Sequence, residues 1–587
     1  MYCPECGTYL EEGELFCPEC GTKVISESGA LSSSFAPPTT GMPEAAAHPH
    51  EEVCDTPVVV KGLILTNLQT LAQRLHVPAQ GLREMIGTYI QTMRQLGAQY
   101  VLLDASDYTY RKKNVLGIRK HVSLDSRNPW YDYADILKDY HDAEVREGQK
   151  ESEYLFIIGG ETDVPMPRLR HYLPNGHDKD FDTDLLYAYP YGQEMEDKLL
   201  QQELFKYDAL FYVGRLPIAA DGSIEDLAGY LQRVLDNGCS VPIQTAYAQC
   251  DPNWQNITLS IVEEINEEKL FPDCIANLPR ETVANGQVLL SPAIVCDNAK
   301  ETHAFFNPYA NYYFFNMHGS NARTAKGFFG QSLQQDYCVC GMSPTLIRSA
   351  QQPNLFFTQA CYGGRFIGYR KHESMLLSAL SAQTLSYVGS SRIAYGSVDQ
   401  PGKVSLSTSD VLAKVYNMCI LAGYTAGQAL FQARIATFKH HPGEPVHALT
   451  ISEFNLYGDP LIHRRSESQN THYTGDKGAI LPPDAQVAPV QTEVLMNKNA
   501  GEQSLLERVR QSVDKNILDI SARIAKSLYA QYGIAAREPS IVSRQTYADG
   551  HKELNFTYEC PIENGLYNDL QVQTDAQGEI QQVNITK

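Results

Sequence analysis

Residues 311–364 hold two short apolar runs, each of which stops at a chemically reactive side chain. The first run reads NYYFFNM (311–317) and stops at His318; the second reads NLFFTQA (354–360) and stops at Cys361. Short aromatic runs that are bounded by turn residues are typical of buried strands rather than helices. If these strands are parallel neighbours, His318 and Cys361 lie past their carboxyl ends, where open α/β sheets place their ligands. A thiol beside an imidazole is a nucleophile–base pair.

Strands and helical patterns alternate around this stretch. Apolar runs predict strands at 100–103, 154–158 and 211–213, and apolar residues at helical spacing predict helices at about 406–422 and 425–439. This alternation indicates a parallel sheet with helices on both faces. It restarts near residue 241. We therefore expect a three-layer α/β/α sandwich built from two consecutive α/β units, residues 57–240 and 241–465.

Length and charge narrow the class of protein. A chain of 587 residues is too long for one hydrophobic core. Its net charge of −21 disfavours nucleic acid and anionic membranes as partners, because contacts to phosphate need clustered Lys and Arg. No apolar run has the length of a membrane span, and the first residues lack the basic and apolar regions of a signal peptide. We expect a cytoplasmic protein.

Residues 1–23 contain the same short motif twice. Cys3 and Cys6 flank one Pro-Glu pair and are followed by Gly7, and Cys17 and Cys20 repeat the pattern. Two such turns supply four thiolates, which predicts a closed tetrahedral site for one structural zinc ion in a zinc ribbon. The alternative is a pair of redox motifs or disulfides, although no strand–helix–strand pattern surrounds the cysteines.

Two segments rich in Pro and polar residues divide the rest of the chain. Residues 24–56 and 466–500 read as flexible linkers. The tail, residues 501–587, has a helical pattern to about residue 532, then strand-like runs near 540–547, 552–559 and 568–585. It predicts a small α+β domain.

Six motifs occur in a fixed order. They are Ile158-Gly159-Gly160-Glu161-Thr162-Asp163-Val164-Pro165, Val213-Gly214-Arg215-Leu216-Pro217, Met317-His318-Gly319-Ser320, Gln359-Ala360-Cys361, Gly389-Ser390-Ser391-Arg392 and Tyr457-Gly458-Asp459-Pro460. In this order, over about residues 58–463, they resemble the gingipain-like family in the caspase-like clan of cysteine peptidases. Gly160 departs from the family, which often has Asp at this position.

The resemblance implies a cysteine endopeptidase that hydrolyses peptide bonds and needs no cofactor for catalysis. Cys361 would be the nucleophile and His318 the general base that later protonates the leaving amine. The backbone N–H groups of Gly319 and Cys361 would stabilise the oxyanion.

The resemblance also implies a substrate pocket. Asp163 matches an acidic position that pairs with a basic side chain before the scissile bond, and Tyr395 is expected to form a wall of the pocket. Arg392 in the same pocket would instead select an acidic residue. Asp163 can equally cap a turn before Pro165.

Each residue also has a simpler interpretation. A cysteine after an apolar strand is often a small buried hydrophobic residue, and a histidine beside glycine is often a turn residue. Two further functions stay open on the sequence: an inactive peptidase fold that serves as a scaffold, or a protease that a partner activates. We expect a protein or peptide substrate, with the zinc ribbon or the C-terminal domain as the surface for a protein partner.

Overall fold

The computed structural model describes residues 60–465 and 491–586, apart from internal stretches, the longest of which are 122–129, 171–178, 266–282, 291–305, 498–514 and 559–569. The zinc ribbon and the first linker predicted from the sequence lie outside the described residues.

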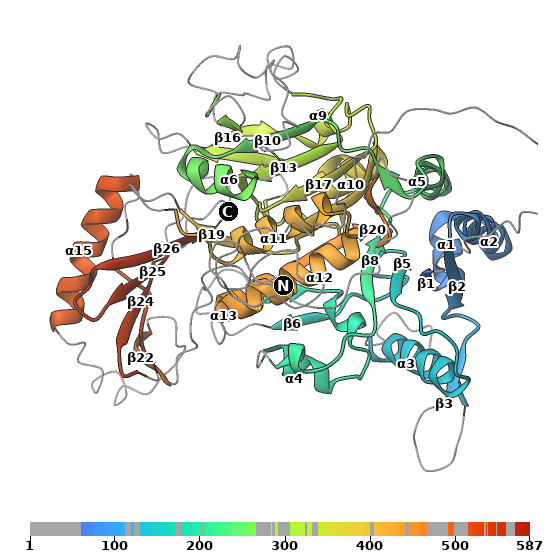
Figure 1. The fold of residues 1–587 in the computed structure, drawn as a ribbon, viewed down its shortest axis with the longest axis horizontal. Helices are drawn as coiled ribbons and strands as arrows, with labels where there is room; N and C mark the ends of the chain where they lie inside the picture. The colour runs from blue at the N-terminus through green and yellow to red at the C-terminus, as the bar shows by residue number, and fades with distance from the viewer. Residues whose placement is uncertain are drawn as a thin grey trace, which may run out of the picture.

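An eleven-stranded sheet forms the centre of the molecule (Figure 1). Its strand order is β11-β12-β10-β13-β17-β18-β20-β8-β5-β1-β2. The strands are β1 (Val60–Thr66), β2 (Ala98–Asp104), β5 (Tyr154–Ile158), β8 (Tyr212–Leu216), β10 (Ala246–Cys250), β11 (Val283–Ala284), β12 (Val288–Leu290), β13 (Tyr312–Asn316), β17 (Asn354–Thr358), β18 (Thr384–Ser390) and β20 (Phe454–Gly458).

Apart from the edge strand β11, which is antiparallel to β12, the sheet consists of two parallel halves that run in opposite directions. β12, β10, β13, β17 and β18 are parallel to one another, and so are β20, β8, β5, β1 and β2. β18 and β20 pair antiparallel, with Val388 opposite Leu456. The carboxyl ends of the two halves therefore lie at opposite edges of the sheet. β20 comes from the second predicted α/β unit but pairs in parallel with β8 of the first.

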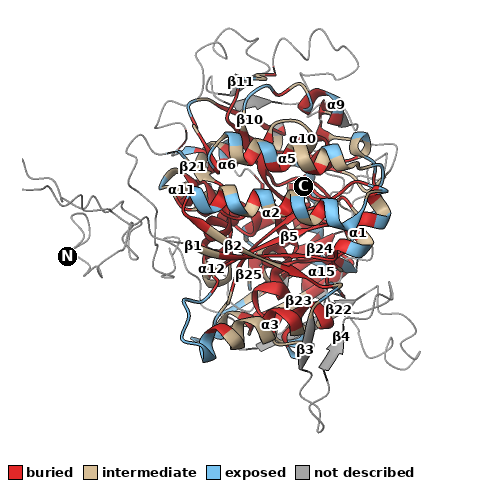
Figure 2. Cartoon of the chain, turned by 90° about the vertical axis from the view of Figure 1, so that its right-hand side faces the viewer, coloured by how far each residue is buried: buried red, intermediate tan, exposed pale blue. Residues whose placement is uncertain are grey.

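Helices cover both faces of the sheet. β1 connects outward to β2 through α1 and α2, whereas β2 connects back to β5 through α3; right-handed crossovers then place α2 and α3 on opposite faces. Figure 2 shows this arrangement at the β1–β2 end of the sheet. The helices are α1 (Leu68–Leu75), α2 (Ala79–Gln95), α3 (Tyr131–Arg146), α4 (Glu194–Leu200), α5 (Ile224–Asp236), α6 (Gln255–Ile261), α9 (Pro344–Ile347), α10 (Met375–Ser381), α11 (Ser409–Leu421), α12 (Ala426–His440) and α13 (Pro445–Glu453). The predicted three-layer α/β fold class is confirmed.

Local sequence explains where several of these helices begin. The side chain of Asn67 accepts the N–H of Thr70 at the start of α1, and Ser223 and Asp226 form a capping box at the start of α5. The central strands β5, β13 and β17 are buried at every residue, as strands covered on both faces must be.

The C-terminal region forms a second, antiparallel sheet with one long helix, α15 (Lys515–Tyr532). Its strand order is β19-β26-β25-β24-β23-β22. The strands are β22 (Gln491–Asn497), β23 (Ile541–Thr546), β24 (Lys552–Tyr558), β25 (Leu570–Asp575), β26 (Ile580–Thr586) and β19 (Tyr395–Ser397). β22 comes from the range predicted to be a linker, and β19 comes from the peptidase part of the chain. The single predicted run at 568–585 is a hairpin of two strands.

Short strands form four smaller sheets. They comprise β14 (His318–Gly319) with β15 (Phe328–Gln331) and β16 (Cys338–Met342), β3 (Thr109–Arg111) with β4 (Arg119–His121), β6 (Arg168–Arg170) with β7 (Asp180–Asp182), and β9 (Ser240–Val241) with β21 (His463–Arg464). No helix in the described part of the chain has both the length and the apolar character needed to cross a bilayer.

Candidate active site

His318 and Cys361 follow two neighbouring strands at the same edge of the sheet. β13 and β17 are parallel, with Phe315 opposite Thr358, and the N–H of Gln359 donates to the carbonyl oxygen of Phe315 at 2.9 Å. Because these strands end two and three residues before His318 and Cys361, the two residues leave the sheet at the same edge. His318 is 1% exposed and Cys361 is 5% exposed, so the site is enclosed.

Gly319 lies against the backbone of Cys361. A Cβ atom at position 319 would lie 1.7 Å from the carbonyl oxygen of Cys361, which no side chain can tolerate. Glycine is therefore required for the loop after β13 and the loop after β17 to touch. This contact brings together the two residues whose N–H groups were predicted to stabilise the oxyanion.

The thiol of Cys361 is tied to a third loop, which follows β18. The N–H of Ala394 donates to Sγ of Cys361 at 3.2 Å, and the N–H of Tyr362 donates to the carbonyl oxygen of Arg392 at 2.7 Å. Tyr362 has a φ of 56°, a left-handed conformation that costs about 1–2 kcal/mol for a residue with a side chain. A backbone donor aimed at sulfur favours negative charge there, as a nucleophilic thiolate needs.

A carboxylate that was not predicted from the sequence stands beside His318. Asp251 directly follows β10, the neighbour of β13, and its Oδ2 lies 3.9 Å from Nε2 of His318. Its Oδ1 accepts the N–H of Asn253 at 2.8 Å, and its own N–H donates to the carbonyl oxygen of Asn316 at 2.9 Å. Asp251 is fully buried. Three adjacent strands thus deliver an acid, an imidazole and a thiol to one edge.

Trp254 also contacts His318 and was not predicted. Its ring centroid lies 4.7 Å from that of the imidazole, at an interplanar angle of 58°. Both Asp251 and Trp254 belong to the segment Cys250-Asp251-Pro252-Asn253-Trp254. An acid at the end of a strand, just before Pro, was the signal available in the sequence.

Of the three predicted pocket residues, Arg392 stands in the loop beside Cys361. Its Nη2 lies 2.8 Å from Oδ2 of Asp182, and the other oxygen of Asp182 accepts from Nε of Arg168 at 2.6 Å. Tyr395 lies in β19 and is 1% exposed. Its side chain is therefore buried and does not line an open pocket.

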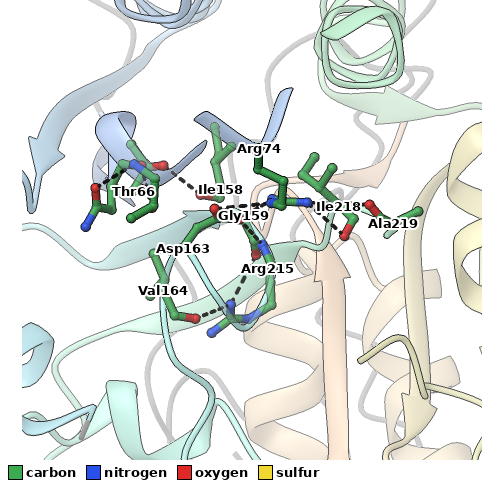
Figure 3. Close-up of polar contacts among 12 residues, drawn as sticks. Thr66, Arg74, Ile158, Gly159, Asp163, Val164, Arg215, Ile218 and Ala219 are labelled. Carbon is green, nitrogen blue, oxygen red and sulfur yellow. Dashed lines mark hydrogen bonds and ion pairs between the residues drawn. The ribbon is translucent and has the colours of Figure 1, made fainter. Parts of the chain in front are cut away.

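Asp163 belongs to a network of polar contacts with Arg74 and Gly160, next to Gly159 and Arg215 (Figure 3). It follows β5, whose carboxyl end is at the opposite edge of the sheet from those of β13 and β17. Its carboxylate is fully buried, forms an ion pair with Arg74 and accepts the N–H of Gly160 at 2.8 Å. Arg74 also donates to the carbonyl oxygen of Ile218 at 3.3 Å. The structure thus does not bring Asp163 together with His318 and Cys361.

Arg215 and Asp459, which belong to two of the six motifs, stabilise the fold. Arg215 is fully buried; its Nε and Nη2 donate to the two carboxylate oxygens of Asp184, both at 2.7 Å, and its Nη1 donates to the carbonyl oxygens of Gly159 and Val164. Asp459 accepts from the hydroxyls of Tyr89 and Tyr100 at 2.5 and 2.6 Å. Burial raises the pKa of Asp459, and the two tyrosine hydrogen bonds oppose this shift.

A small pocket opens next to Cys361. Its lining includes Ser320, Gly327, Tyr362 and Arg365, and it has about 30 Å³ of space for water-sized groups. Binding sites for small molecules typically measure about 300–1,000 Å³. The enclosed space beside the thiol is therefore much smaller than a typical small-molecule site.

Several solved structures resemble the chain at low sequence identity. A structure described as a protease has 11% identity and a TM-score of 0.42, and covers 92% of this chain and 99% of its own. The Arg-specific cysteine proteinase gingipain R has 13% identity and a TM-score of 0.40, over 92% of this chain and 100% of its own. The separase–securin complex of Saccharomyces cerevisiae has 12% identity and a TM-score of 0.27, over 50% of this chain and 18% of its own. No curated protein matches the chain.

Two family profiles match the sequence. The zinc-ribbon domain matches residues 2–24, which include Cys3, Cys6, Cys17 and Cys20. The profile of peptidase family C25 matches residues 131–464, the greater part of the chain, and this range contains Asp251, His318 and Cys361. The chain is a cysteine peptidase and belongs to peptidase family C25.

Proposed function

We propose that Cys361, His318 and Asp251 carry out endopeptidase catalysis in this chain. The observation that carries the proposal is the register of β10, β13 and β17, which places the three residues after adjacent parallel strands. Within the described residues, the same edge of the sheet holds Gly319 against the backbone of Cys361. Nucleophile, base, orienting carboxylate and backbone donors are the parts that acyl transfer requires.

Each group has a chemical role. The sulfur of Cys361, as thiolate, attacks the peptide carbonyl carbon, and the N–H groups of Gly319 and Cys361 stabilise the resulting oxyanion. His318 then donates its proton to the leaving amine, and the C–N bond breaks to leave a thioester on Cys361. His318 next takes a proton from water, and the hydroxide attacks the thioester carbonyl. The carboxylic acid product leaves, and the thiolate is regenerated. Asp251 stabilises the protonated imidazole from 3.9 Å.

Asp163 and Arg392 are the two charged residues considered for recognition of the residue before the scissile bond. Asp163 cannot receive a basic side chain without losing its ion pair with Arg74, because its carboxylate is fully enclosed. Arg392 is closer to the nucleophile, and its charge is partly balanced by Asp182. Cleavage after a basic residue stays a prediction, and it needs an acid other than Asp163.

The zinc ribbon gives the second part of the proposal. Four thiolates in two turns bind one structural zinc ion and leave no open position for chemistry. We propose that this ribbon is a docking module for a protein partner, separate from the site of hydrolysis.

The deciding experiment combines labelling of the thiol with peptide hydrolysis. Iodoacetamide is expected to alkylate Cys361 faster than the other cysteines, and the Cys361→Ala variant is expected to lose cleavage of a peptide library. Cys419 is a matched reference within the same chain, because its burial raises its thiol pKa far above the ordinary value. A chain that cleaves nothing and whose Cys361 resists alkylation, in wild type and also in an Asn584→Ala variant that weakens the contact of β26 with β19, is a scaffold and not an endopeptidase.

A further inference from the structure

The C-terminal domain completes its sheet with a strand of the active-site loop. β19 pairs antiparallel with β26, with Tyr395 opposite Thr586 and Ser397 opposite Asn584. The hydroxyl of Ser407 adds a hydrogen bond to Oδ1 of Asn584 at 2.6 Å. Figure 1 shows β26 beside β19 at the junction between the two sheets. The last strand of the domain is thus anchored in the loop that follows β18.

This junction lies next to the nucleophile. β19 begins one residue after Ala394, whose N–H donates to Sγ of Cys361. Because the pairing is antiparallel, β26 runs toward Ala394, and its carboxyl end is the end that approaches the thiol. An extended peptide that adds to the edge of a strand gains main-chain hydrogen bonds in the same way. A substrate segment that precedes the scissile bond would also run toward the thiol.

The docked domain also helps to enclose the catalytic imidazole. Trp254, which packs on His318, is buried in the same apolar cluster as Ile520 and Ile524 of α15 and Ile585 of β26. Trp254 is fully buried. One face of the C-terminal domain therefore reaches the residue that covers His318.

We propose that the C-terminal domain is an inhibitor in cis, whose strand β26 occupies the edge on which an extended peptide docks beside Cys361. This inference rests on the proposed peptidase function. Hydrolysis then requires β26 to leave β19, which also frees Trp254 and opens the site. The exchange is feasible because the ladder pairs only three residues of β19 with β26, and a substrate strand replaces the main-chain hydrogen bonds that are lost.

A disulfide across the junction tests the proposal. The N–H of Val398 donates to the carbonyl oxygen of Val583, which marks that pair as hydrogen-bonded. Ser397 and Asn584 are then a non-hydrogen-bonded pair, in which Cα atoms lie about 4.5 Å apart, within the range that a disulfide spans. The variant is the full-length double substitution Ser397→Cys with Asn584→Cys, and the control is Ser397→Cys alone.

The locked variant is expected to lose at least tenfold in peptide hydrolysis when oxidised and to regain it on reduction. Its Cys361 is expected to react at least tenfold more slowly with a peptidyl chloromethyl ketone while the disulfide is intact. Wild type and Ser397→Cys, taken through the same oxidation and reduction, show whether Cys361 itself has been oxidised. An oxidised double variant that hydrolyses peptide at the rate of these controls would overturn the inference and leave the proposed function standing.

A variant that weakens the contact between β26 and β19 should have the opposite effect on peptide hydrolysis. Asn584→Ala removes the hydrogen bond from Ser407, so β26 is expected to leave more readily and hydrolysis to rise severalfold. A fall in hydrolysis, or no change, means that docking orders the site or is irrelevant to it, and rejects inhibition. If wild type, the reduced double variant and Asn584→Ala are all inert toward peptides and toward the chloromethyl ketone, the proposed function fails, and this inference fails with it.

Discussion

Oδ2 of Asp251 lies 3.9 Å from Nε2 of His318, and both side chains are enclosed by the protein. At this distance the two groups form an ion pair whenever the imidazole is protonated, although they are too far apart for a direct hydrogen bond. The pair links β10 to β13 at the catalytic edge. Asp251 is therefore a positioning residue that acts through His318.

Substitution of Asp251 tests this role. Asp251→Asn is expected to lower kcat by about 10²–10⁴-fold, because the amide does not stabilise the imidazolium that forms during acyl transfer. KM should change little, and the pH profile of kcat should shift, which a merely structural role would not cause. Asp236→Asn, at an exposed position in α5, is the matched control. Equal pH profiles for Asp251→Asn and wild type would contradict the assignment.

The nucleophile and the base are expected to act as one unit. Cys361→Ala and His318→Ala should each abolish detectable hydrolysis, and the double variant should lose no more than either single one. Thermal unfolding measured beside the kinetics separates lost chemistry from lost fold. Residual turnover that falls stepwise from the single to the double variant would show that the two residues act independently.

The buried ion pair between Arg215 and Asp184 predicts a specific pattern of stability. Arg215→Met leaves the carboxylate of Asp184 buried without its partner and should lower the free energy of unfolding by about 3–5 kcal/mol. Adding Asp184→Leu removes the isolated charge and should recover part of that loss. Urea unfolding followed by circular dichroism measures both variants. A double variant less stable than Arg215→Met would show that the pair is not coupled in this way.

Specificity is tested with peptides that differ only in the residue before the scissile bond. Asp163→Ala should lower stability by breaking the ion pair with Arg74, while the ratio of kcat/KM values for Arg, Lys, Asp and Asn peptides stays that of wild type. Arg392→Ala should change this ratio, because Arg392 lies in the loop that contacts Cys361. A preference for Arg that is lost in Asp163→Ala would instead support the pocket around Asp163 that was predicted from the sequence.

Loss of zinc should affect the N-terminal ribbon without affecting peptide hydrolysis. The reduced protein is expected to contain one zinc ion, and Cys3→Ser with Cys6→Ser should abolish zinc binding. Peptide hydrolysis by that variant, assayed without chelator, should match wild type because the ribbon is not part of the catalytic site. Zinc content that persists in the variant would place the ion elsewhere.

Continuous apolar runs made the central strands predictable. Residues 154–158, 312–316 and 354–358 are strands as expected, because strands buried on both faces leave a strong local pattern. Their neighbours in the sheet were less visible. β20 pairs antiparallel with β18 because a strand from late in the sequence is inserted between two earlier strands. No local sequence pattern indicates this change of direction.

The candidate site was predictable in part for the same reason. His318 and Cys361 follow aromatic runs, whereas Asp251 follows β10, whose sequence Ala-Tyr-Ala-Gln-Cys is only weakly strand-like. Asp163 was chosen by its position in a motif, and its ion pair with Arg74 comes from a residue 89 positions earlier in the chain. β19 has three residues and was missed because so short a strand gains its stability from a neighbour in the sheet. β22 was missed because it lies in a polar range that was predicted to be a linker.

The insertion of β20 between β18 and β8 has a consequence for synthesis of the chain. Tyr457 pairs with Arg215, so the partner of β8 leaves the ribosome 242 residues after it (457 − 215). At about 5–20 residues per second, the edge of β8 stays open for roughly 10–50 s. The nucleophile at position 361 emerges before the sheet can close, and β26 emerges after the other described strands. A ribosome-bound chain would therefore expose an unpaired edge of its first half-sheet, which makes that half the part most in need of a chaperone.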